Sequence, residues 1–152
     1  MKSILILNGP NMNILGIRDP GLYGTGSLED LEAKCIEYGK RRGVRVECRQ
    51  SNHEGTLIDW IHDAMGNFDG IVLNAGGYTH TSIALMDAVS GTGTPTIEVH
   101  LTDVQAREEF RRVSFIARVA TGVISGHGAE SYTKAIDLLI NGETNALDRP
   151  AV

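Results

Sequence analysis

Short apolar runs alternate with helix-like segments along this 152-residue chain, and this alternation is the feature that most constrains its fold. Most of the runs are continuously apolar or β-branched, as expected for parallel strands whose two sheet faces are both covered. The strands predicted in this way are Lys2–Asn8, Val44–Gln50, Gly70–Asn74, Thr96–His100 and Ala117–Ile124.

Apolar residues at helical spacing fill the segments between these runs. Ser27 followed by Asp30 predicts the start of the first helix, and Gly142 predicts the end of the last one. Repeated βα units with short connections imply right-handed crossovers. We therefore expect an α/β protein, a flavodoxin-like three-layer sandwich around a five-stranded parallel sheet. Residues 1–142 would form one domain, and 143–152 a loose polar tail.

Composition narrows the possible partners. The net charge is −5, and no segment gathers enough Lys and Arg for a nucleic-acid surface. Cys35 and Cys48 lack metal-ligand spacing, so reduced thiols are favoured over a disulfide. The apolar run near the N-terminus is too short for a signal peptide or a membrane span. We expect a cytoplasmic protein that binds no membrane.

The segment Gly9–Gly26 has neither a helix nor a strand pattern. It follows the first predicted strand, where open α/β sheets bind their ligands, and a loop of this length is typically a lid or a binding loop. It contains Asn11, Arg18 and Tyr23. Tyr23 alone could be a surface aromatic, but a cation beside it would favour the phenolate. This loop thus predicts a group that could deprotonate a small polar molecule.

Polar residues also follow the other strands, in the stretches Gln50–Gly55, Asn74–Ser82, Glu98–Thr102 and Ser125–Gly128. Because the carboxyl ends of parallel strands meet at one edge, these groups are expected to converge on one crevice. Glu98 and His100 lie two apart on a strand and share a face, so the carboxylate can orient and charge the imidazole.

Several of these residues also have a purely structural interpretation. His80 could cap the helix that begins after Gly77, or it could meet an anion at that helix start. His100 could be a satisfied histidine at the sheet edge. Arg107 and Arg111, four apart on one predicted helix face, fit either a solvated face or an anion site.

Motifs of several other enzyme classes are missing from the sequence. Gly24-Thr25-Gly26 lacks the third glycine of the dinucleotide fingerprint, and there is no Walker-type motif. There is also no Gly-x-Ser-x-Gly elbow and no recognisable metal-ligand spacing. The residues expected in the crevice predict acid–base chemistry on a polyhydroxylated anion, without a cofactor or a metal.

Four separate blocks of the sequence resemble type II 3-dehydroquinate dehydratase, and the resemblance covers residues 2 to about 140. It implies a flavodoxin-like fold and the cofactor-free dehydration of 3-dehydroquinate to 3-dehydroshikimate through an enolate, in aromatic biosynthesis or quinate breakdown. It also implies a homo-oligomer built from trimers, commonly a dodecamer. The blocks are Leu7–Asn11, Gln50–Gly55, Asn74–Ser82, and Glu98–His100 with Ala106–Glu108.

The resemblance assigns catalytic roles to five residues. Tyr23 resembles the base that takes a proton from the carbon beside the ketone, and Arg18 would favour its phenolate. Asn11 resembles the residue that holds a water at the enolate oxygen. His100, oriented by Glu98, resembles the general acid that protonates the departing hydroxyl.

A second set resembles the family's substrate-binding residues. Backbone N–H groups of Leu101 and Thr102 would meet the substrate carboxylate, and Asp87 would reach the site of a neighbouring subunit. Arg107 resembles an arginine that closes a lid formed by Ile17–Gly26. The remaining side chains of this set are Asn74, His80 and Arg111.

The chain departs from the family pattern beside the substrate, at Ala75, Asp103, Gln105, Glu109 and the pair Arg112-Val113. These changes bear on affinity and lid closure more than on chemistry. Two other functions fit the same pocket: a non-catalytic module that binds small anions, and a dehydratase of a related cyclic hydroxy-keto acid. Retention of the predicted base and acid favours catalysis, because a binding module needs neither.

Overall fold

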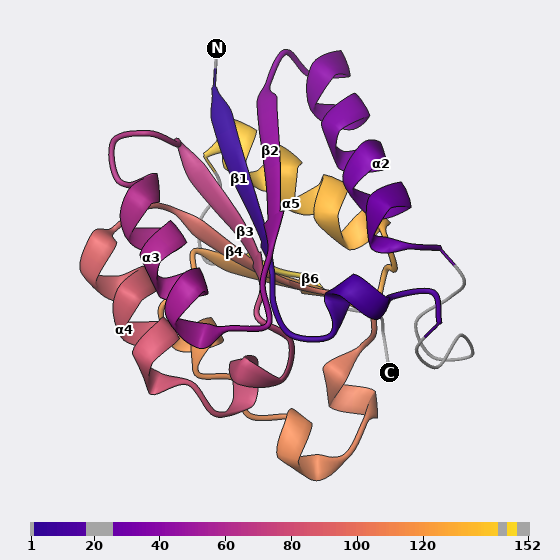
Figure 1. The fold of residues 1–152 in the computed structure, drawn as a ribbon, viewed down its shortest axis with the longest axis vertical. Helices are drawn as coiled ribbons and strands as arrows, with labels where there is room; N and C mark the ends of the chain where they lie inside the picture. Colours follow the sequence, from indigo (N-terminus) through magenta and orange to yellow (C-terminus); the bar gives the residue numbers. More distant parts are fainter. Residues whose placement is uncertain (1, 18–25, 143–145, 149–152) are drawn as a thin grey trace.

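The computed structural model describes residues 2–17, 26–142 and 146–148. Within this part of the chain, six parallel strands form one sheet in the order β2-β1-β3-β4-β5-β6 (Figure 1). The strands are β1 (Ser3–Asn8), β2 (Arg45–Gln50), β3 (Gly70–Asn74), β4 (Thr96–His100), β5 (Gly122–Ser125) and β6 (Ala146–Asp148).

Helices cover both faces of the sheet. In Figure 1, α2 and α5 lie on one side, and α3 and α4 lie on the other. This arrangement confirms the predicted three-layer α/β sandwich, and its first five strands follow the flavodoxin order. The helices are α2 (Leu28–Arg41), α3 (Glu54–Ala64), α4 (Ile83–Thr92) and α5 (Glu130–Asn141).

The continuous apolar runs are explained by two cores, one on each face. Ile4 and Ile6 of β1 pack into the core beneath α2 and α5, whereas Leu5 and Leu7 pack into the core beneath α3 and α4. Successive strand residues point to opposite faces, so a strand covered on both sides needs an apolar residue at every position.

Both predicted helix-end signals are confirmed. Ser27 and Asp30 form a reciprocal capping box, in which each side chain accepts a hydrogen bond from the other residue's backbone N–H. Gly142 ends α5 in the left-handed conformation, with φ 71°. Glycine adopts this conformation without the steric penalty that a Cβ brings.

The prediction of a strand over Ala117–Ile124 is wrong in its first part. Residues Ile116–Arg118 instead form a 3-10 turn, η5, and β5 begins only at Gly122. The hydroxyl of Ser114 accepts a hydrogen bond from the Ala117 N–H, which starts the turn. Ile116 is fully buried in the core beneath α3 and α4.

The predicted loose tail is also wrong in part. Residues Ala146–Asp148 form β6, which pairs in parallel with β5 from Gly122 to Ile124. An edge strand presents unpaired backbone groups, and a short segment of chain can satisfy them whatever its side chains are. Residues 143–145 and 149–152 lie outside the described residues.

Both cysteines are free thiols, as predicted. Burial raises the pKa of Cys35 and of Cys48 to about 12, so both remain protonated at neutral pH. Among the described helices, none has the length and apolar character needed to cross a membrane.

Candidate active site

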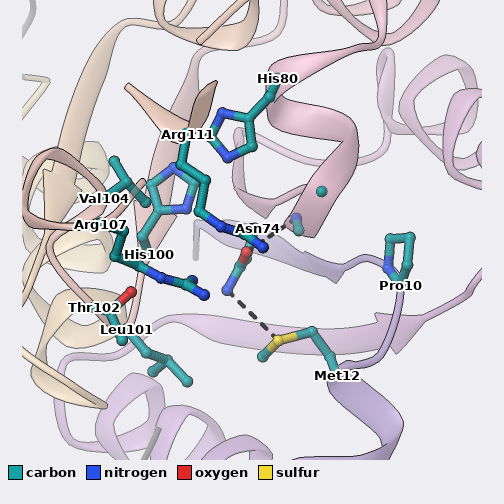
Figure 2. A pocket seen from close by; sticks show the side chains of 12 residues that line it. Pro10, Met12, Asn74, His80, His100, Leu101, Thr102, Val104, Arg107 and Arg111 are labelled. Atoms are coloured by element: carbon teal, nitrogen blue, oxygen red, sulfur yellow. Dashed lines mark hydrogen bonds between the residues drawn. The ribbon is translucent and has the colours of Figure 1, made fainter. Parts of the chain in front are cut away.

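A pocket lies at the carboxyl edge of the sheet, beside the ends of β3 and β4 (Figure 2). Polar side chains from separate loops point into it, which confirms that the residues after several strands converge on one crevice. The pocket brings together seven of the residues predicted for the site: Asn74, His80, His100, Leu101, Thr102, Arg107 and Arg111. Backbone or side chains of Pro10, Met12, Gly76, Gly77 and Val104 complete its lining.

Close packing of two loops forms one wall of this pocket. A Cβ on Gly9 would lie 2.6 Å from the Ala75 carbonyl oxygen, a distance that only displacement of the backbone could relieve. Gly76 has φ +60°, and a Cβ there would lie 3.1 Å from the Pro10 carbonyl oxygen. Glycine at both positions therefore allows the loops after β1 and β3 to meet.

His100 is paired with a buried carboxylate. Its Nε2 lies 2.6 Å from Glu98 Oε2, and the two residues are 5% and 1% exposed. This geometry confirms that the two side chains share one strand face. Because the carboxylate accepts, Nε2 carries a proton, and Nδ1 is the nitrogen left to exchange a proton with a ligand. The carboxylate thereby fixes the orientation of the imidazole.

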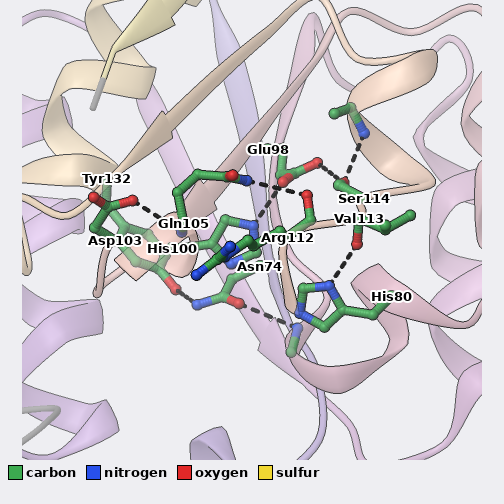
Figure 3. A network of polar contacts seen from close by, with 12 residues as sticks. Asn74, His80, Glu98, His100, Asp103, Gln105, Arg112, Val113, Ser114 and Tyr132 are labelled. Atoms are coloured by element: carbon green, nitrogen blue, oxygen red, sulfur yellow. Dashed lines mark hydrogen bonds and ion pairs between the residues drawn. The ribbon is translucent and has the colours of Figure 1, made fainter. Parts of the chain in front are cut away.

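Ser114 completes the contacts of Glu98. Its hydroxyl donates to Glu98 Oε1 at 2.6 Å and accepts from the Ala117 N–H at 2.9 Å (Figure 3). Both Glu98 oxygens are therefore hydrogen-bonded, which fixes the carboxylate behind the imidazole. Sequence reasoning missed Ser114, because it lies 16 residues from Glu98 and carries no motif of its own.

His80 is held by the same segment that carries Ser114. Its Nδ1 lies 2.6 Å from the carbonyl oxygen of Val113, so Nδ1 carries the proton and Nε2 is left as an acceptor. Burial lowers the pKa of His80, which keeps the ring neutral at pH 7. Ser82 caps α4 by accepting from the Leu85 N–H at 2.9 Å, so the capping interpretation of His80 is wrong.

Two residues that depart from the family pattern brace this segment. The side-chain amide of Gln105 donates to the Arg112 carbonyl at 3.0 Å. Asp103 accepts from the Gln105 backbone N–H at 3.0 Å and caps the 3-10 turn η3 (Val104–Ala106). Their side chains thus support the segment that contacts His80 through Val113 and Glu98 through Ser114.

Arg107 and Arg111 do not share a helix, contrary to the prediction. Arg107 follows η3, and Arg111 ends a separate 3-10 turn, η4 (Glu109–Arg111). Both nevertheless line the pocket, and Glu108 lies between them: its carboxylate accepts from Arg111 Nε at 2.7 Å and lies 3.8 Å from Arg107 Nε. The hydrogen bond from Arg111 lowers the pKa of Glu108.

Asn11 lies beside the pocket in a strained backbone conformation. Its φ is 71°, the only positive φ of a non-glycine residue in the described chain. Asparagine tolerates this region better than most residues. The side chain of Asn52 accepts from the Asn11 backbone N–H at 3.0 Å and from Gln50 Nε2 at 3.1 Å, so the loop after β2 holds the turn.

Among the described residues, Asp87 is the predicted site residue that lies away from this pocket. Asp87 is exposed on α4 and does not line it. Arg18 and Tyr23 lie outside the described residues, as does most of the predicted lid. Within the described chain, no three His, Cys, Asp or Glu side chains form a group that could hold a metal.

The fold and the pocket define a parallel α/β protein with a pocket lined by two histidines and two arginines at the carboxyl edge of its sheet. The family model "Dehydroquinase class II" matches residues 2–140. The chain belongs to this family, which confirms the resemblance found in the sequence.

Individual relatives agree with this assignment. The chain is 58% identical over 139 residues to a 3-dehydroquinate dehydratase of Ruegeria pomeroyi, with 91% of this chain and 93% of the relative covered. It is 54% identical over 145 residues to a 3-dehydroquinate dehydratase of Variovorax paradoxus, with coverage of 92% and 99%. The crystal structure of type II dehydroquinase from Butyrivibrio crossotus superposes with a TM-score of 0.90 at 47% identity, covering 91% of this chain and 97% of that one.

Proposed function

We propose that this protein removes water from 3-dehydroquinate to give 3-dehydroshikimate, without a cofactor and through an enolate intermediate. The observation that best supports this is the buried Glu98–His100 pair, whose imidazole opens into a cationic pocket. A carboxylate-oriented histidine suits the protonation of a departing hydroxyl. Family membership and the named relatives support the choice of substrate.

The pocket suggests how the substrate would be held. Arg111, with the backbone N–H groups of Leu101 and Thr102, would bind the carboxylate. Asn74 and His80 would hydrogen-bond the ring hydroxyls, and the neutral His80 would offer Nε2 as an acceptor. With the substrate fixed in this way, His100 Nδ1 would protonate the hydroxyl as it leaves.

The first half of the reaction is assigned to the loop after β1. Tyr23 would remove the proton beside the ketone, and Arg18 would favour its phenolate. Asn11 would hold a water that stabilises the enolate oxygen. Arg107 would help to close Ile17–Gly26 over the substrate, so that the base is delivered on closure.

We also propose that the working unit is at least a trimer, within a dodecamer of the kind the resemblance implies. Asp87 supports this, because it is exposed on α4 and does not line the pocket of its own chain. In a trimer it could reach the pocket of a neighbouring subunit. Sedimentation of the purified protein would measure the assembly.

Ultraviolet absorbance tests the reaction directly. On mixing the protein with 3-dehydroquinate, we expect absorbance to rise as the conjugated enone of the product forms. The rise should persist with a chelator and after a borohydride challenge, because the proposal requires neither a metal nor a lysine imine. Absence of a rise with binding still detected by calorimetry would instead support a binding module or a different substrate.

Ser114 should contribute to turnover through Glu98. Ser114→Ala is expected to lower kcat about tenfold, because a hydrogen bond to a charged group is worth about 1.5–3 kcal/mol. Ser114→Thr keeps the hydroxyl and should recover most of the activity. Steady-state kinetics of the two variants provides the measurement. Unchanged kcat in the alanine variant, or equal losses in both, would contradict this role.

A further inference from the structure

A fully buried tyrosine on the helix layer contacts a residue that lines the pocket. Tyr132 lies on α5 and is 0% exposed, and its hydroxyl lies between the ends of β1 and β3. The oxygen is 2.5 Å from Asn8 Oδ1 and 2.9 Å from Asn74 Nδ2. Asn74 lines the pocket, whereas Tyr132 does not, so the phenol contacts the back of a pocket residue (Figure 3).

The direction of each hydrogen bond between Asn8, Tyr132 and Asn74 is fixed. The Gly76 N–H donates to Asn74 Oδ1 at 3.2 Å, so the amide nitrogen of Asn74 must face Tyr132. Tyr132 therefore accepts from Asn74, and its single proton goes to Asn8 Oδ1. Burial raises the pKa of Tyr132 far above its ordinary value, so the phenol keeps that proton at any working pH.

This orientation leaves one N–H of Asn74 for the pocket. Besides the Tyr132 oxygen, Asn74 Nδ2 contacts the Met12 sulfur at 3.7 Å (Figure 2). A thioether is a weak acceptor, and Met12 itself lines the pocket. An oxygen of a bound ligand would be a stronger partner for this N–H.

The hydrogen bonding of Asn8 indicates that the Asn8–Tyr132–Asn74 hydrogen bonds do more than stabilise the core. Asn8 is fully buried, and its Nδ2 has no hydrogen-bond partner among the described residues. A buried unpaired N–H is unfavourable, and an apolar residue here would avoid it. What Asn8 provides is Oδ1, the acceptor that forces the phenol to present its lone pair to Asn74.

We propose that Tyr132 is a positioning residue, which locks the Asn74 amide so that it offers an N–H donor, and not its carbonyl, to a ligand oxygen. The pocket therefore selects an acceptor oxygen of the ligand at this point. Because the ligand is taken to be 3-dehydroquinate, this inference rests on the proposed function. Tyr132 acts through Asn74 and touches no ligand itself.

Tyr132→Phe removes only the hydroxyl. The KM for 3-dehydroquinate is expected to rise about tenfold, the order of effect of one lost buried hydrogen bond, with kcat changed by less than about twofold. Tyr38→Phe is the matched control: its hydroxyl also bonds a neighbouring helix, to Asp137 on α5 at 2.6 Å, and it does not line the pocket. Both variants should lower Tm, but the control should leave KM unchanged.

A double-mutant cycle then tests whether the effect passes through Asn74. In an Asn74→Ala background, Tyr132→Phe should leave KM unchanged, because there is no amide left to orient. An additive rise in KM there would overturn the proposal. So would an unchanged KM in Tyr132→Phe alone, or a fall in kcat at constant KM, which would indicate a smaller folded fraction.

Two further measurements keep the outcome decisive. If Tyr132→Phe does not fold, Asn8→Ala removes the acceptor of the phenol proton and should raise KM in the same direction; an unchanged KM would overturn the proposal. If the wild-type protein does not turn over 3-dehydroquinate, the proposed function fails. Calorimetric affinity for 3-dehydroquinate, compared between wild type and Tyr132→Phe, would then still report on positioning.

Discussion

Replacing His100 with alanine is expected to lower kcat by about 100- to 10,000-fold, the range typical of a lost general acid, with a much smaller change in KM. The imidazole is 5% exposed and is anchored through Nε2 to Glu98, so Nδ1 is the nitrogen left to exchange a proton with a ligand. In this variant, Arg111 and the backbone N–H groups after β4 would still bind the substrate carboxylate. The loss should therefore fall on the chemical step.

Two other variants separate acid catalysis from binding. Glu98→Gln keeps the size of the side chain but removes the negative charge beside His100 Nε2, so it should lower kcat in the same way and to a smaller extent. His80→Ala should mainly raise KM, because His80 is neutral and is placed to accept a hydrogen bond. Equal losses of kcat and binding affinity in His100→Ala would instead make His100 a binding residue.

Local patterns sufficed to predict most of the fold. The strand ranges at Gly70–Asn74 and Thr96–His100 are confirmed residue for residue, because runs covered on both faces are rich in apolar and β-branched residues. The strand predicted over Ala117–Ile124 was too long at its start, because a β-branched, apolar pattern also fits a turn that buries a side chain. The turn η5 buries Ile116 in this way. The pairing of β6 depends on backbone groups, which leave no trace in side-chain pattern.

The site residues also fall into two groups, those that local sequence spacing predicts and those that it does not. Glu98 and His100 were predictable as a pair, since two-residue spacing on a strand fixes a shared face. Ser114 and Tyr132 were not, because their contacts join segments 16 and 58 residues apart that only tertiary packing brings together. Arg111 was a candidate from its position after β4 and again from the family resemblance, although the helix expected to carry it is a pair of short turns.

Two side chains are candidates for the base of the proposed reaction. Among the described residues that line the pocket, the side chains that titrate are two histidines and two arginines. Arginine does not deprotonate in proteins, and His100 is assigned to the acid step. His80 is thus the one described alternative to Tyr23, since burial lowers its pKa and its Nε2 is an acceptor.

Tyr23→Phe discriminates between these two bases. If Tyr23 removes the proton, the variant should lose turnover by about 100-fold or more, while calorimetric affinity for 3-dehydroquinate survives, because the ring is kept and only the hydroxyl is lost. If His80 is the base, Tyr23→Phe should remain active and His80→Gln should be the inactive variant. Retained activity in Tyr23→Phe would therefore indicate that His80, at the end of η2 (Gly76–His80), removes the proton in place of Tyr23.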